Sequence, residues 1–106
     1  MSDVHGNIEA LNSVLKDIDN LGIDKIICTG DLVGYGPYPN EVVNTFMDQK
    51  IPSTLGNHDL ATFDMGLLME LGGIANESIV LTLEIMGQNE KDYLTKLPRS
   101  IDFRNL

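Results

Sequence analysis

The sequence predicts an α/β fold in which helices flank a parallel or mixed β-sheet. Two stretches with apolar residues at helical spacing are each followed by a short apolar run without helical period, as expected for a helix and then a strand. A cluster of polar residues follows each short run. Alternating helices and strands indicate a parallel sheet with right-handed crossovers, in which ligands collect beyond the carboxyl ends of the strands.

The first helix is predicted over residues 8–21. Its apolar residues recur every three or four positions, Asn7 is placed as an N-cap, and Gly22 provides a C-terminal stop. A buried parallel strand is predicted over residues 23–29, because this segment is short, rich in isoleucine and without helical period. The strand ends in a Gly-Asp pair.

A second helix and strand follow a loop over residues 32–40, whose glycines and prolines exclude regular structure. The helix is expected to begin near Pro39 or Asn40, and the strand, which contains a proline, to cover residues 51–55. Three further helices and the beginning of another strand are predicted at residues 64–71, 76–86, 89–97 and 99–103.

The length of 106 residues fits one small domain, which we assign to residues 1–106. Asp and Glu number 16 against 7 Lys and Arg, so the formal charge is −9. This charge repels a phosphate backbone at long range and excludes duplex nucleic acid as a partner. A small phosphate ester stays compatible with it, because bound divalent cations reverse the local field.

The sequence contains neither a membrane-length apolar segment nor a basic region followed by an apolar run at its start. We therefore expect a cytoplasmic protein without a membrane partner. Cys28 is the single cysteine, which excludes an intrachain disulfide. Its apolar neighbours favour packing as a small hydrophobic side chain over a functional thiol.

The residues that carry chemistry form three clusters: Asp3-Val4-His5, Gly30-Asp31 and Gly56-Asn57-His58-Asp59. In order and spacing they resemble the D-x-H, G-D and G-N-H-D/E pattern of calcineurin-like metallophosphoesterases. The longer phrases Ser-Asp-Val-His-Gly-Asn and Gly-Asp-Leu-Val-Gly-Tyr-Gly-Pro are similar to the small prokaryotic branch of that family. The resemblance covers nearly the whole chain and implies the N-terminal part of a four-layer α/β/β/α sandwich.

The resemblance also implies two divalent metal ions and assigns their ligands. Asp3 and His5 would bind the first ion, Asp31 would bridge both, and Asn57 would bind the second through its amide oxygen. Carboxylate, imidazole and amide donors suit Mn, Fe, Zn, Ni or Mg, and manganese is the ion we favour. The implied reaction is hydrolysis of a phosphate mono- or diester, or of a nucleotide, by a hydroxide that bridges the two ions.

Two further residues receive catalytic roles from the resemblance. His58 would face the substrate, stabilise the charge on phosphorus and protonate the leaving oxygen. Asp59 would orient His58, since a carboxylate beside an imidazole fixes its tautomer and direction. Gly30 and Gly56 would permit the tight turns that bring these side chains together.

Each cluster alone has a simpler explanation. Asp3 and His5 are compatible with an exposed loop, Gly30-Asp31 with an ordinary turn, and residues 56–59 with the cap of a following helix. The conjunction of all three favours a site over an unrelated α/β domain. Tyr35 and Tyr38 flank the loop after Asp31, where packing is preferred over a role in substrate access.

The sequence also departs from the family pattern, which continues with a lone His and then a Gly-His-x-His element. Only His5 and His58 are present, and only two residues precede Asp3 instead of a full strand. We therefore expect a truncated domain of low activity, whose unpaired strand edges favour self-association. The alternative is an inactive metal-binding or scaffolding module of the same fold.

Overall fold

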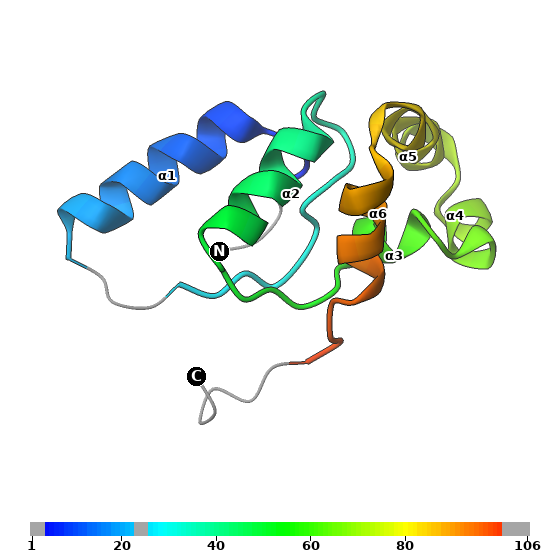
Figure 1. The fold of residues 1–106 in the computed structure, drawn as a ribbon. Coiled ribbons are helices and arrows are strands. Elements are labelled where there is room, and N and C mark those ends of the chain that lie inside the picture. Colours follow the sequence, from blue (N-terminus) through cyan, green and yellow to red (C-terminus); the bar gives the residue numbers. More distant parts are fainter. Residues whose placement is uncertain (1–3, 23–25, 101–106) are drawn as a thin grey trace.

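The computed structural model describes residues 4–22 and 26–100. Asp3, the beginning of the strand expected over 23–29 and most of the strand expected over 99–103 lie outside these ranges. The described part contains six helices, connected by loops (Figure 1): α1 (Ile8–Asn20), α2 (Pro39–Asp48), α3 (Asn57–Ala61), α4 (Met65–Leu71), α5 (Gly73–Ile85) and α6 (Gln88–Thr95).

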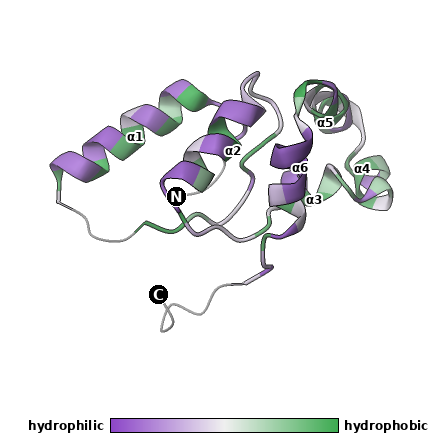
Figure 2. Cartoon of the chain, in the orientation of Figure 1, coloured by the Kyte–Doolittle hydropathy of each residue, from purple (hydrophilic) through white to green (hydrophobic). Residues whose placement is uncertain are grey.

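Helix α1 confirms the prediction made from apolar spacing and capping. The Asn7 side chain accepts a hydrogen bond from the N–H of Ala10 at 3.0 Å, which satisfies a donor that the first turn would otherwise leave without a partner. Gly22 follows the helix with φ of 69°, a conformation that glycine adopts without steric cost. Figure 2 shows hydrophobic positions of α1 alternating with hydrophilic ones, as expected for a helix with one buried stripe.

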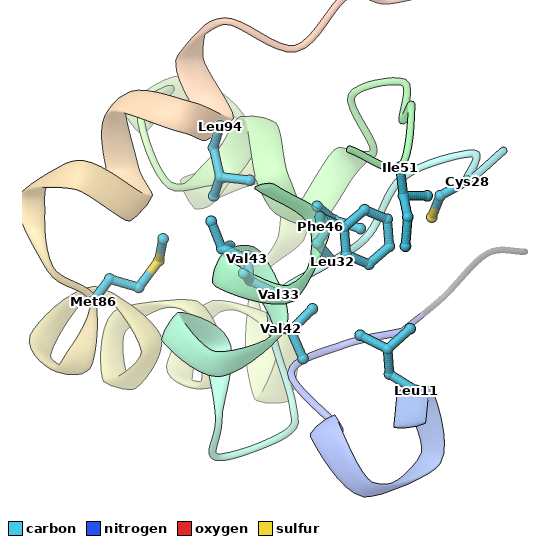
Figure 3. Close-up of a cluster of buried hydrophobic side chains, with 10 residues drawn as sticks. All are labelled: Leu11, Cys28, Leu32, Val33, Val42, Val43, Phe46, Ile51, Met86 and Leu94. Carbon is cyan, nitrogen blue, oxygen red and sulfur yellow. The ribbon is translucent and has the colours of Figure 1, made fainter. Parts of the chain in front are cut away.

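Helix α2 lies at the centre of the larger core and contacts α1, α5 and α6. It begins at Pro39, as predicted, and proline at the first position suits a helix because its missing N–H needs no partner there. Val42, Val43 and Phe46 are buried on its inner face. Figure 3 shows these side chains together with the rest of the buried cluster, which is Leu11, Cys28, Leu32, Val33, Ile51, Met86 and Leu94.

The two expected strands meet in a single parallel bridge between Cys28 and Ser53. The N–H of Cys28 donates to the carbonyl of Pro52 at 2.9 Å, and the N–H of Thr54 donates to the carbonyl of Cys28 at 3.0 Å. The relative direction of the two segments is therefore as predicted. The wider sheet stays a prediction, because this bridge is the only strand pairing among the described residues. A stable parallel sheet requires further strands beside such a pair.

The helices after residue 63 follow the predicted order with small shifts at their ends. Helix α4 begins after Asp64, whose side chain accepts from the N–H of Leu67 at 3.1 Å and caps the helix. The side chain of Asn40 connects α2 to the turn between α5 and α6. Its amide nitrogen donates to the carbonyl of Ile85, and its amide oxygen accepts from the N–H of Gly87. Within the described ranges, no helix has both the length and the apolar character needed to cross a membrane.

Candidate functional site

The turn that carries Asp31 is built on close contact between two backbones. Gly30 has φ of 105°, and a Cβ added to it would lie 2.6 Å from the Cα of Gly56 and still closer to its nitrogen. A Cβ on Gly56 would in turn collide with the backbone and the carboxylate of Asp31. Only two glycines allow this approach, which brings the second and third polar clusters together as predicted.

The carboxylate of Asp59 is the main polar connection between these clusters. It is 0% exposed and accepts hydrogen bonds from the N–H groups of Asp31 at 2.9 Å, Leu32 at 2.9 Å, Val33 at 3.3 Å and Gly56 at 3.1 Å. All four donors are backbone groups from the two turns. Asp59 thus fixes the loop that follows Asp31, a function that the sequence did not reveal. Its expected role in orienting His58 stays a prediction.

Burial has the largest effect on the pKa of the Asp59 carboxyl. Loss of solvent raises the pKa of this carboxyl to about 6, and the nearby negative charge of Asp31 acts in the same direction. Hydrogen bonds from the backbone of Gly56, Val33 and Leu32 lower the pKa but do not offset the burial. The site therefore contains a carboxyl that titrates well above the ordinary range of an aspartate.

Asp31 forms a second hydrogen bond between the same two turns, this time as the acceptor. Its carboxylate oxygen Oδ1 accepts the N–H of His58 at 2.9 Å, at the first turn of α3, and the residue adopts a φ of 57°. A non-glycine residue with positive φ is uncommon and occurs preferentially at functional sites. Asn57 is the first residue of α3 and its side chain is exposed. The start of α3 therefore holds the candidate ligand Asn57 and the candidate catalytic residue His58 beside Asp31.

His5 is joined to the same loop through both its backbone and its ring. Its N–H donates to the carbonyl of Asp31 at 2.8 Å, and its Nδ1 lies 3.1 Å from the carbonyl oxygen of Val33. A carbonyl oxygen only accepts, so Nδ1 carries a proton, and in the neutral imidazole the lone pair is then on Nε2. This is the arrangement found in histidines that bind metal, where a hydrogen bond at one nitrogen orients the other toward the ion.

Three rings meet at this point of the molecule. The ring centroids of His5 and His58 are 4.7 Å apart, and Tyr35 lies 5.2 Å from the first and 4.9 Å from the second. The structure thus brings together the predicted residues His5, Asp31, His58 and Asp59. It adds Tyr35, for which packing was the preferred explanation; the Gly-Tyr-Gly sequence around this residue was the available signal.

The donors fit divalent cations in their chemistry. His5 presents an imidazole lone pair, Asn57 an amide oxygen, and Asp31 a carboxylate that retains acceptor capacity beyond its one hydrogen bond. Over residues 4–22 and 26–100, however, no three side chains of His, Cys, Asp and Glu lie close enough together to enclose an ion. The described residues therefore do not enclose an ion by themselves, and the candidate ligand Asp3 lies outside them.

Comparison with known proteins identifies the family. Residues 1–100 match the family of calcineurin-like phosphoesterases. The chain belongs to this family.

Three proteins similar to this calcineurin-like phosphoesterase chain are each longer than it. An uncharacterised protein of Methanocaldococcus jannaschii is 40% identical over 102 residues, which are 96% of this chain and 42% of that protein. A metallophosphoesterase from Sphaerobacter thermophilus has 35% identity and a TM-score of 0.73, with 96% of this chain and 42% of that chain covered. A candidate diadenosine tetraphosphatase has 28% identity and a TM-score of 0.70, with 92% of this chain and 40% of that chain covered. The chain thus spans about two fifths of the length of these relatives.

Proposed function

We propose that this chain forms part of the active site of a metal-dependent phosphoesterase. In this proposal His5 and Asp31, together with Asp3 and Asn57, hold two divalent cations, of which manganese is the favoured one. When bound, these ions supply the positive charge that holds the phosphate and the acidity that activates water. The observation that carries the proposal is the convergence of His5, Asp31 and His58 on one loop whose backbone is fixed by Asp59.

The residues of the chain have separate tasks in the reaction. The hydrogen bond from Nδ1 of His5 to the carbonyl of Val33 keeps Nε2 directed as a ligand. Asp31 binds cations through its carboxylate while accepting the N–H of His58, so ligand and catalytic residue are held in fixed relation. The imidazole of His58 donates a proton to the oxygen that leaves phosphorus, which is the ordinary task of a histidine acting as general acid.

The ester can be a monoester, a diester or a nucleotide. The relatives support a phosphate ester as substrate, since one is a metallophosphoesterase and another a candidate diadenosine tetraphosphatase. Four candidate ligands do not saturate two ions. We therefore expect the isolated chain to bind manganese weakly and to hydrolyse phosphate esters slowly.

Metal titration calorimetry on the 106-residue chain tests the metal site. Asp31→Asn keeps an oxygen for the N–H of His58 but removes the charge, and His5→Gln removes the imidazole. Both variants should lose Mn²⁺ binding, whereas Asp48→Asn, at the exposed end of α2, should bind as the unmodified chain does. Unchanged binding in both site variants would disprove the assignment of these ligands.

Hydrolysis of p-nitrophenyl phosphate and bis-p-nitrophenyl phosphate tests the catalytic assignment. We expect slow turnover that requires Mn²⁺ and disappears in His58→Ala. Metal binding without turnover above the His58→Ala background would favour the alternative of an inactive binding module. Comparison of the two substrates separates monoesterase from diesterase activity.

A further inference from the structure

The ring of Tyr35 lies beside both imidazoles, and the glycines on either side of this residue contact the two histidines. Gly34 has φ of 92°, and a Cβ on it would collide with Nδ1 of His58. The N–H of Gly36 donates to the carbonyl of His5 at 2.6 Å, and a Cβ on Gly36 would collide with that same carbonyl oxygen. The residue between them therefore has its position set by both histidines.

The backbone of Tyr35 is also fixed by a contact with α5. Its φ is 64°, which costs free energy for a residue with a Cβ and persists only where surrounding contacts impose it. Its N–H donates to the hydroxyl of Ser78, a residue of α5 far along the sequence. These contacts fix the backbone of Tyr35 and leave its side chain exposed.

Packing does not explain this ring, because Tyr35 keeps 55% of its surface exposed beside two partly buried imidazoles. A tyrosine that served only as core would bury its ring, as Phe46 does at 1% exposure. An exposed aromatic ring next to a reaction centre offers a flat apolar surface to a ligand. Aromatic side chains in such positions bind planar bases by stacking.

We propose that Tyr35 is a substrate-positioning residue that stacks against a planar aromatic group carried by the phosphate ester, such as a nucleobase. This inference rests on the proposed phosphoesterase function and narrows its substrate class. The phosphate would lie at His5 and His58, and the aromatic group would lie against the tyrosine ring beside them. Esters without an aromatic group would bind through the phosphate alone.

The test compares AMP with ribose 5-phosphate, which differ only in the base, by calorimetry in the presence of Mn²⁺. The unmodified chain should bind AMP about ten-fold more tightly, which is the ordinary effect of one stacked base. Tyr35→Phe should keep this preference and Tyr35→Leu should lose it. Tyr38→Leu, which removes the other exposed tyrosine of the loop, should keep it. The ring proton resonances of Tyr35 should shift with AMP and not with ribose 5-phosphate.

Equal affinity of the unmodified chain for AMP and ribose 5-phosphate would overturn the inference while leaving the phosphoesterase assignment intact. Loss of the preference in Tyr35→Phe would also overturn it, since the hydroxyl rather than the ring would then be responsible. Failure to bind either compound or Mn²⁺ would defeat the proposed function as well. The resonance shifts decide the matter on the unmodified chain if Tyr35→Leu does not fold.

Discussion

Asp31 and Asp59 hold each other's segments of chain in place. The carboxylate of Asp59 accepts the N–H of Asp31 at 2.9 Å, while the carboxylate of Asp31 accepts, also at 2.9 Å, the N–H of His58, the residue before Asp59. The two turns that carry the candidate site are thus joined by a reciprocal pair of charged hydrogen bonds. Charged acceptors make hydrogen bonds stronger than neutral ones, so this pair contributes to both stability and geometry.

Asp59→Asn should destabilise the chain by about 2–4 kcal/mol, because an amide group would replace one oxygen that accepts two N–H groups. Urea unfolding at pH 4, where the folded chain keeps the carboxyl protonated, measures the change. Asp48→Asn is the matched control and should change the free energy of unfolding by less than about 0.5 kcal/mol, since that residue is exposed. Equal effects of the two substitutions would show that the contacts of Asp59 are dispensable.

Stability should fall with rising pH through the titration of Asp59. Burial raises the pKa of this carboxyl from 3.8 to about 6, so the folded chain binds the proton more tightly than the unfolded chain does. The resulting stabilisation, about 3 kcal/mol, is complete below pH 4, is lost as the pH rises to 6 and is absent above it. Urea unfolding across this range, with a chelator present, should show a difference between the unmodified chain and Asp59→Asn that shrinks from pH 4 to pH 7. A constant difference would contradict the raised pKa.

Gly30→Ala should cost much more stability than Gly22→Ala. Both glycines have positive φ, but a Cβ at Gly30 collides with the backbone of Gly56, whereas a Cβ at Gly22 meets no atom within 4 Å. Gly22→Ala therefore measures the cost of the conformation alone, about 1 kcal/mol. Gly30→Ala should add several kcal/mol from the collision and should reduce Mn²⁺ binding. Similar unfolding free energies for both variants would rule out the close approach of the two turns.

Cys28 should react slowly with thiol reagents in the folded chain. The side chain is 0% exposed, and burial raises the pKa of its thiol, so little thiolate is present near neutral pH. Labelling with a chromogenic disulfide should proceed at the unfolding rate and become fast in guanidinium chloride. Rapid labelling under native conditions would place this cysteine outside the core.

The parts of the fold that depend on neighbouring residues were predictable. Helix α1 follows from apolar spacing and from the Asn7 cap, which acts over three residues. The short helix α3 was foreseen only through the alternative that residues 56–59 cap a following helix, because its sequence has no helical apolar pattern. The strands were predicted from composition, but pairing depends on distant segments, and only the bridge between Cys28 and Ser53 is present among the described residues.

In the candidate site, too, the features that depend on neighbouring residues were predictable and those that depend on distant segments were not. Glycines and polar residues marked the turns, and the structure brings His5, Asp31 and His58 together as predicted. The four backbone hydrogen bonds of Asp59 join positions 26 to 28 residues apart as well as one three residues away. Nothing in the local sequence distinguishes such a carboxylate from one that faces a histidine. The ring of Tyr35 was equally ambiguous, since exposure depends on which segments fold over it.

The contact between Gly30 and Gly56 has a consequence for motion. Two backbones that touch without side chains between them have nothing to rearrange, so neither turn shifts without carrying the other along. We therefore expect the loop at Asp31 and the first turn of α3 to move together, so that a shift of α3 against its neighbour α4 also displaces the Asp31 carboxylate.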